Sequence, residues 1–349
     1  MKVGVDGRKL PRATSRHPVE NVEAAAKLGM DGVFFRTVLD LTPDLDRGLL
    51  REVRQRADEL GLYLEMGLAK VNPYANAEAP EVRELGSGDY RRGMIAMMEA
   101  AAEIGCTELW VATANYKPKL PGFYVFDRFR TDVTWPEQLE ATERFLHSLA
   151  PAARDLGCHL NLETHEEITS FELVRLVEAV GDDVLGITFD TGNVIARGED
   201  PVAAARRVAP FARMSHVRDI ALFHTEYGIG RMLAPAGEGV IDWPEVLRIL
   251  AAHNPGLQLS IENSRDRTVM PLHVYDETWL ASHPDLTTVE LAEVFRLTRE
   301  YEERSARGEL PSPEYLLSHP CDEEEQLRFI EATAAHLRGV LAEMESATG

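Results

Sequence analysis

The chain has few cysteines, no long apolar run and no surplus of basic residues. Only three cysteines (Cys106, Cys158 and Cys321) occur in 349 residues, too few for a disulfide framework or a zinc cluster. No apolar stretch approaches the roughly 20 residues that a membrane helix needs. The N-terminus lacks the apolar core of a signal peptide. We therefore expect a cytoplasmic protein with no membrane partner.

The shortage of basic residues is large, because 37 Lys and Arg face 58 Asp and Glu, for a formal net charge of −21. Such a negative field repels phosphate backbones, so we expect no nucleic-acid partner. Hydrophobic residues make up 44% of the chain and charged residues 27%. These values are typical of a soluble globular protein that buries a substantial core.

What the sequence does contain is a regular alternation of short β-branched or aromatic runs with longer stretches of helical spacing. The strand-like runs cover residues 2–6, 32–37, 62–67, 108–115, 159–165, 185–193, 214–219 and 257–263. Alternating strands and helices indicate parallel β/α units, and eight units close a (β/α)8 TIM barrel. An open doubly wound sheet is the alternative, but DGRKLP after the first strand is not a glycine-rich phosphate loop.

Residues 1–349 are predicted to form a single TIM-barrel domain with two additions and a C-terminal helical extension. Residues 117–135, after the fourth strand, are rich in Tyr, Phe and Arg and belong on the side of the barrel where active sites form. Residues 273–322 form an extension whose charged composition suits a solvated face and a homo-oligomer contact. A last helix over 323–345 is expected to complete the barrel wall.

Acidic or imidazole side chains end four consecutive strands, at Glu163, Asp190, His216 and Glu262. Side chains alternate faces along a strand, and the apolar neighbours of these four residues occupy the outward face. Each of the four alone is more simply a cap or an ion-pair partner. Together, at one barrel mouth, they suit a divalent ion such as Mn2+, Mg2+, Co2+ or Zn2+, which would relieve the repulsion among three carboxylates.

Further polar residues are expected beside this cluster. His165 shares the inward face with Glu163 and lies about 6 to 7 Å along the strand, so that it serves either as a base or as a residue that orients a metal ligand. Arg218 either contacts substrate oxygens or pairs with Asp219 or another acid. Asn193 and Asn115 are candidate partners of sugar hydroxyls.

Other charged and aromatic residues near the strand ends are interpreted as structural. Arg36, Glu65 and Lys70 are expected to belong to ion-pair networks. The aromatic loop 123–129 either lines the substrate pocket or simply packs. Glu166 and Glu167 fall in the loop before the next helix, where we expect them to be solvated or to lie near the helix N-terminus.

Five segments together resemble the xylose isomerase-like, or sugar phosphate isomerase/epimerase, superfamily of TIM barrels. They are LNLETH (160–165), GITFDTGN (186–193), SHVRD (215–219), PAGEGVIDWPEVLRIL (235–250) and LSIEN (259–263). The resemblance implies a metal site on Glu163, Asp190, His216 and Glu262, with Mn2+ as the first choice. It also implies a carbohydrate or glycoside substrate and removal of a proton beside a carbonyl.

Two branches of that superfamily assign the proton transfer differently. In the ketose 3-epimerase branch the metal-binding glutamates, here Glu163 and Glu262, do this work. The E-x-H pattern of Glu163 and His165 looks more like the α-subunits of C-glycoside deglycosylation enzymes, in which a histidine removes the proton, the aglycone leaves and a small accessory subunit can be present. The resemblance therefore implies a metal-dependent carbohydrate lyase or isomerase/epimerase.

Two other classes of protein share such a barrel. An abasic-site endonuclease would need several metals and a groove for DNA, which the acidic charge disfavours. A metal-stabilised subunit without catalytic turnover would not need His165 beside an intact set of ligands.

Overall fold

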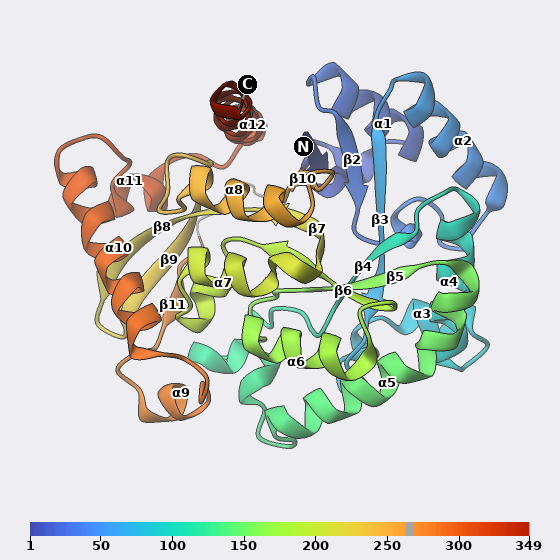
Figure 1. The fold of residues 1–349 in the computed structure, drawn as a ribbon, viewed down its shortest axis with the longest axis horizontal. Helices are drawn as coiled ribbons and strands as arrows, with labels where there is room; N and C mark the ends of the chain where they lie inside the picture. Colours follow the sequence, from blue (N-terminus) through green and yellow to red (C-terminus); the bar gives the residue numbers. More distant parts are fainter. Residues whose placement is uncertain (263–267, 349) are drawn as a thin grey trace.

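Eight parallel strands form a closed barrel in the computed structural model, which describes residues 1–262 and 268–348. The barrel strands are β1 (Lys2–Asp6), β2 (Gly32–Phe35), β3 (Tyr63–Lys70), β4 (Glu108–Ala112), β5 (His159–Glu163), β6 (Leu185–Asp190), β7 (Ala212–Val217) and β10 (Gln258–Ile261). Their order around the barrel follows the chain, and β10 pairs with β1 to close it. Each strand falls within or overlaps one of the eight predicted runs, so the predicted TIM barrel is confirmed (Figure 1).

Helices surround the barrel on its outer side (Figure 1). They include α1 (Pro18–Lys27), α2 (Arg47–Glu59), α4 (Tyr90–Glu103), α5 (Trp135–Leu156), α6 (Ser170–Val180), α7 (Pro201–Val208) and α8 (Trp243–His253). Two of them begin with reciprocal capping boxes, Thr134 with Glu137 at α5 and Thr169 with Glu172 at α6, which satisfy backbone N–H groups that the first helical turn leaves free. Among the described residues, no helix is both long and apolar enough to span a membrane.

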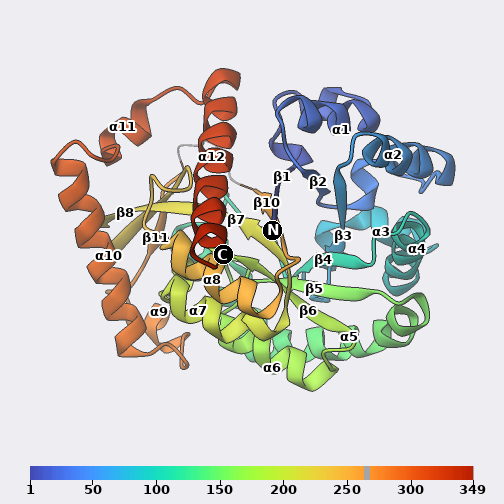
Figure 2. The ribbon, with the colours of Figure 1, turned by 45° about the horizontal axis from the view of Figure 1, so that its top comes forward.

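The C-terminal part of the chain adds further helices. They are α9 (Glu277–Ala281), α10 (Thr288–Ala306), α11 (Pro313–Ser318) and α12 (Glu323–Thr348), while the short α3 (Pro80–Leu85) precedes α4. Helix α12 lies against α8 and β1 (Figure 2). The predicted last helix therefore exists and extends to residue 348.

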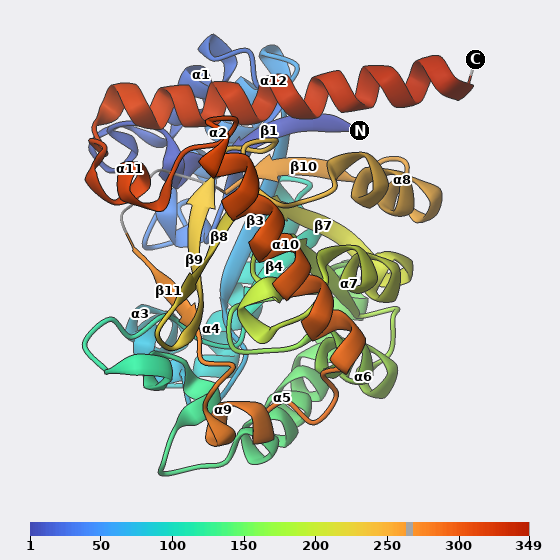
Figure 3. The same cartoon turned by 90° about the vertical axis from the view of Figure 1, so that its left-hand side faces the viewer.

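A three-stranded antiparallel sheet lies outside the barrel and was not predicted. It consists of β8 (Asp219–Thr225), β9 (Gly228–Ala234) and β11 (Met270–Leu272). Strand β7 ends at Val217 and β8 begins at Asp219, so that Arg218 lies between them. The hairpin turns at residues 226–227, and Gly228, which begins β9, has a φ of 131° that favours glycine. Helix α10 packs along β8 (Figure 3). The hairpin thus forms a wall beside the carboxyl ends of the barrel strands.

Candidate functional site

The four predicted metal ligands come together at the carboxyl ends of their strands. Glu163 ends β5, Asp190 ends β6, His216 lies in β7 and Glu262 follows β10; all four are buried. One potential ligand atom from each residue lies within 4.8 Å of the others. Strand register explains part of this arrangement, because Asp190 pairs directly with His216 across β6 and β7. The cluster can hold a divalent ion, while the assignment of each residue as a ligand stays a prediction.

The donor atoms of this cluster fit such an ion. His216 Nδ1 lies 3.1 Å from both Glu163 Oε1 and Glu262 Oε2. His216 Nε2 is buried without a hydrogen bond among the described residues. Buried polar atoms normally have such partners. Three carboxylates and one imidazole form a set of ligands suited to Mn2+ and similar ions.

Neighbouring side chains hold these groups in place. Trp110 Nε1 donates to Glu163 Oε2 at 3.0 Å, and the backbone N–H groups of Gly192 and Asn193 donate to Asp190 Oδ1 at 3.0 and 2.9 Å. Such partners fix the orientation of metal-binding carboxylates. Burial raises the pKa of Asp190 to about 6, with Arg218 opposing the shift and the charge of Glu163 adding to it. Burial acts the same way on Glu163, but His216 outweighs it and lowers the pKa well below its ordinary value.

The loop after β5 corrects one prediction. Glu166 and Glu167 were expected to be solvated or to lie near the N-terminus of the next helix. They do precede Thr169, the N-cap of α6, but they are only 5% and 1% exposed, so the solvated alternative is wrong. Glu167 Oε2 accepts a hydrogen bond from His165 Nδ1 at 2.5 Å, and its other oxygen accepts one from Thr113. Burial alone would raise the pKa of Glu167, but His165 and Thr113 lower it to about 2. An ionised Glu167 therefore fixes the tautomer of His165 with the N–H on Nδ1. In the neutral ring, Nε2 then carries the lone pair that can accept a proton.

The same carboxylate changes the basicity of the imidazole. Burial lowers the pKa of His165, but the charge and hydrogen bond of Glu167 outweigh burial, so the net shift is upward. A histidine in this setting is a stronger proton acceptor than an isolated buried one.

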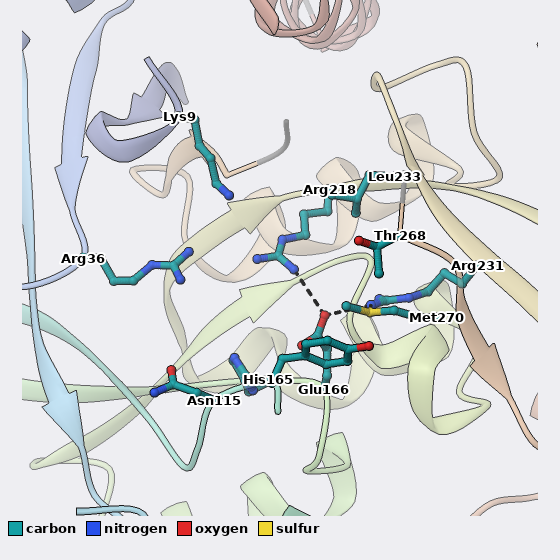
Figure 4. Close-up of a pocket in the computed structure, with 11 residues that line it drawn as sticks. Lys9, Arg36, Asn115, His165, Glu166, Arg218, Arg231, Leu233, Thr268 and Met270 are labelled. Atoms are coloured by element: carbon teal, nitrogen blue, oxygen red, sulfur yellow. Dashed lines mark hydrogen bonds and ion pairs between the residues drawn. The ribbon is translucent and has the colours of Figure 1, made fainter. Parts of the chain in front are cut away.

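A pocket of about 330 Å³ (Figure 4) opens beside the four potential metal ligands, which together are called the metal cluster. Residues from the barrel-strand ends and from the outer hairpin share its wall. They are Lys9, Arg36, Asn115, Tyr116, His165, Glu166, Arg218, Arg231, Leu233, Thr268 and Met270. The predicted candidates His165, Asn115 and Arg218 therefore border one space.

Arg218 forms ion pairs with acids other than Asp219. It lies 3.0 Å from Asp190 Oδ2 and 2.7 Å from Glu262 Oε2, whereas the Asp219 carboxylate accepts hydrogen bonds from the backbone of Gly237 and from Trp243. Arg218 also lines the pocket, and its contact with substrate oxygens stays a prediction. Arg218 is thus positioned between the metal cluster and the pocket.

Asn193 occupies a different place from the one expected. It is fully buried, its Oδ1 accepts a hydrogen bond from Arg218 at 3.0 Å, and its Nδ2 lies 3.5 Å from Glu163 Oε1. Asn193 therefore orients Arg218 and Glu163, and it is not among the residues that line the pocket.

Arg36, Glu65 and Lys70 were each expected to belong to an ion-pair network, and among the described residues Arg36 alone of the three forms ion pairs, with Asp6 and Glu262. Arg36 contacts Glu262 and lies 3.5 Å from Asp6. Glu65 accepts a hydrogen bond from Ser260 at 2.6 Å, and burial raises its pKa to about 8. Lys70 lies 5.3 Å from the centre of the Trp110 ring, and burial lowers its pKa to about 8.

The aromatic loop 123–129 packs instead of lining this pocket. Phe126 and Phe129 lie 4.8 and 5.8 Å from the guanidinium of Arg197, which is also 6.0 Å from the ring of Trp279 in α9. Arg128 joins the same loop to the C-terminal extension by donating to the backbone oxygen of Ser282. The loop and the extension are therefore held together, and Arg128 also donates to the backbone oxygen of Glu167.

Arg231 is the main site residue that the sequence did not reveal. It projects from β9, is buried, and lies 2.8 Å from Glu166 Oε1. It also donates to the backbone oxygen of Gly192 at 2.9 Å. The alternating pattern of residues 228–234 was the available signal for this strand.

Comparisons with known proteins identify relatives of this chain. Residues 22–296 match the xylose isomerase-like TIM barrel family. A 3-oxo-isoapionate decarboxylase from Pectobacterium atrosepticum is 24% identical over 72% of this chain and 81% of its own length. An inosose dehydratase from Bacillus thuringiensis is 27% identical, and the uncharacterized protein YihM from Escherichia coli is 30% identical. These two matches cover 30% and 27% of this chain, and only 40% and 29% of the relatives.

Solved structures give the same fold. The D-psicose 3-epimerase from Clostridium cellulolyticum H10 has a TM-score of 0.64, with 15% identity over 98% of this chain and 99% of the other. An L-ribulose 3-epimerase has a TM-score of 0.60, with 15% identity over 100% of this chain and 98% of the other. At this identity the likeness concerns the fold. The family match covers most of the chain and includes all four residues of the cluster, namely Glu163, Asp190, His216 and Glu262. The chain belongs to the xylose isomerase-like TIM barrel family.

Proposed function

We propose that this protein is a divalent-metal-dependent enzyme that removes a proton beside the carbonyl of a keto sugar or 3-keto glycoside, with His165 as the base. One observation carries the proposal: an imidazole held by the buried Glu167 borders a pocket that Arg218 also lines, and Arg218 pairs with two of the four potential metal ligands, Asp190 and Glu262. Elimination, as in C-glycoside deglycosylation, or isomerisation would follow removal of the proton.

Glu163, Asp190, His216 and Glu262 would hold the ion. A bound Mn2+, or Mg2+, Co2+ or Zn2+ in its place, supplies Lewis-acid polarisation of the substrate carbonyl. Arg218 would stabilise the negative charge that develops on the oxygen as the proton leaves. Asn115 would bind a sugar hydroxyl from the opposite side of the pocket.

The contacts of the carboxylates favour His165 over Glu163 and Glu262 as the base. Glu163 lies within hydrogen-bond distance of Trp110 and His216, and Glu262 contacts both Arg36 and Arg218. A carboxylate whose negative charge is stabilised in this way is a weak base. His165 keeps a ring nitrogen that Glu167 does not use.

The relatives support chemistry beside a carbonyl. Their names state decarboxylation of a 3-oxo acid, dehydration of an inosose and 3-epimerisation. Loss of carbon dioxide, loss of water and epimerisation at a carbon beside a ketone all proceed through an enolate. We therefore propose that the reaction of this chain also proceeds through an enolate, and we assign it none of the relatives' substrates.

Solvent deuterium exchange tests this function. Mn2+-loaded protein is incubated in D2O with ketoses and 3-keto glycosides, and mass spectrometry follows deuterium in recovered substrate and product. His165→Ala should lower exchange at least about 100-fold, the size of a general-base contribution. His159→Ala is the matched control, because His159 begins the same strand and bonds to Glu108 at its other end.

Two outcomes would overturn the proposal. One is the absence of exchange by the wild type on every compound; the other is undiminished exchange by His165→Ala. Exchange that survives His165→Ala and is lost in Glu262→Gln with the metal retained would instead support epimerisation by the glutamates. Product analysis of the same panel separates a lyase from an epimerase.

We also propose that the C-terminal extension mediates a homo-oligomer contact. Five large apolar side chains of the extension are exposed, namely Tyr275, Leu280, Val289, Tyr315 and Leu317, and a contact with a second copy of the chain would cover some of them. Light scattering of the purified protein measures the oligomeric state, and co-purification from the native host tests for a small accessory subunit.

A further inference from the structure

Four cationic side chains from separate parts of the chain reach the pocket. Lys9 ends the short 3-10 helix η1 (Gly7–Lys9), Arg36 follows β2, Arg218 follows β7 and Arg231 lies in β9. Figure 4 shows their charged ends directed toward the space that they enclose. This gathering is unusual in a protein with a net charge of −21.

The cations have different surroundings. Arg231 is 2% exposed and bound to Glu166 and to the backbone of Gly192, so it is part of the wall. The side chains of Arg36 and Arg218 are 25% and 12% exposed, and both reach Glu262. These two guanidinium groups therefore lie where the pocket meets the metal cluster.

The charge balance of the site indicates what it can accept. Among the described residues, Arg36, Arg218 and Arg231 pair with four buried carboxylates, namely Asp6, Glu166, Asp190 and Glu262. A divalent ion on the cluster would draw on the negative charge of Asp190 and Glu262. More of the positive charge of Arg36 and Arg218 would then face the pocket, where it favours an anionic group.

We propose that the substrate is a keto sugar acid whose carboxylate is bound by Arg36 and Arg218, with Lys9 adding positive potential. This inference rests on the proposed function, because it names the substrate class of the same site. Guanidinium groups match the planar carboxylate with paired hydrogen bonds. The volume of about 330 Å³ lies at the small end for ligand pockets and suits one sugar unit.

Equilibrium binding of unreactive ligands tests the charge preference apart from turnover. Isothermal titration calorimetry of Mn2+-loaded protein compares gluconate with glucitol, its neutral counterpart, and with glucitol 6-phosphate. Gluconate should bind at least about tenfold more tightly than glucitol, with an advantage that shrinks as salt is added. Equal affinity for gluconate and glucitol would overturn the proposal. Tighter binding of the phosphate would overturn the assignment of a carboxylate.

Two variants test which residues cause the preference for gluconate over glucitol. Lys9→Gln and Arg36→Gln should each lower the ratio of gluconate to glucitol affinity by about three- to tenfold. Arg8→Gln is the matched control, because Arg8 precedes Lys9 but its Nε donates to Asp40 at 2.8 Å, and it does not line this pocket. A ratio that stays the same in both test variants, with circular dichroism showing folded protein, would refute the assigned residues.

The two proposals can fail separately. Deuterium exchange with neutral keto sugars, together with no preference for gluconate, would refute the proposal of a sugar-acid substrate and retain the proposed enolising function. A preference for gluconate without exchange on any keto sugar, acidic or neutral, would refute the proposed enolising function and retain the proposed anion-binding site.

Discussion

Replacing Glu167 with glutamine should slow proton removal while leaving the pocket wall in place. The side chain keeps its size but loses the charge that faces His165 Nδ1 at 2.5 Å. When His165 takes a proton from the substrate it becomes an imidazolium, and an ionised Glu167 stabilises that cation. The neutral glutamine cannot do so and can also turn its amide N–H toward the ring, which would favour the wrong tautomer.

The pKa of Glu167 gives the size of the effect. A shift from the ordinary value of 4.5 to about 2 corresponds to about 3 kcal/mol of stabilisation of the carboxylate. His165 contributes most to that stabilisation, ahead of Thr113 and Lys70. Assigning about 2 kcal/mol to the pair predicts a roughly 30-fold lower rate, within the 10- to 100-fold range of partners that orient reactive histidines.

The assay is solvent deuterium exchange at saturating substrate, with kcat and KM determined separately. Glu167→Gln should lower kcat with little change in KM, because Glu167 does not line the pocket. Thr113→Val, which removes the hydrogen bond to the other carboxylate oxygen, should have a smaller effect in the same direction. A wild-type kcat in Glu167→Gln would refute the reasoning.

A matched control separates loss of a buried carboxylate from loss of the histidine partner. Glu199 is equally buried but bonds to Ser170 and Arg207, outside the pocket. Burial raises its pKa to about 7, so glutamine resembles its protonated form. Glu199→Gln should keep the wild-type kcat, and an equal loss in both variants would show that Glu167 acts only through stability.

Two further predictions concern the metal and the packing of helices. Glu163→Gln should lower the bound-metal content after dialysis at least about tenfold, because it removes an anionic ligand; elemental analysis measures this, and an unchanged content would contradict the site. Gly93→Ala in α4 should destabilise the protein by about 1–3 kcal/mol, since its Cβ would overlap the backbone oxygen of Val82. Gly339→Ala in α12 meets nothing within 4 Å and should stabilise by about 0.5–1 kcal/mol. Urea unfolding measures both, and shifts of the same sign would refute the packing argument.

The barrel and the metal cluster were predictable because both follow from alternation along strands. Successive side chains of a strand point to opposite faces. Once the apolar residues are assigned to the face that packs on the outer helices, Glu163, His216 and Glu262 must point inward. Closure of the barrel then places the strand ends at one mouth, as the register of Asp190 with His216 shows. No information about distant contacts was needed for this step.

The outer hairpin and the buried loop acids were harder to predict for a different reason. Parity does not apply to a loop, so the sequence could not say which way Glu166 and Glu167 point. Their burial depends on partners elsewhere, and Arg231 lies 65 residues after Glu166. The alternation in 228–234 was visible, but eight other runs already completed a barrel, and nothing local showed that a ninth segment would border the pocket.

These long-range contacts make the hairpin part of the site. A carboxylate as buried as Glu166 needs a partner, because an unpaired buried charge costs several kcal/mol. Arg231 supplies that partner and also donates to the backbone oxygen of Gly192, two residues after Asp190. One guanidinium from β9 therefore fixes the loop after β5, which carries His165, against the loop after β6, which follows the potential metal ligand Asp190. If His165 is the base, we expect a strand outside the barrel to set its distance from the four potential ligands, so two barrels of this family with the same strand-end residues can differ in where the base meets the substrate.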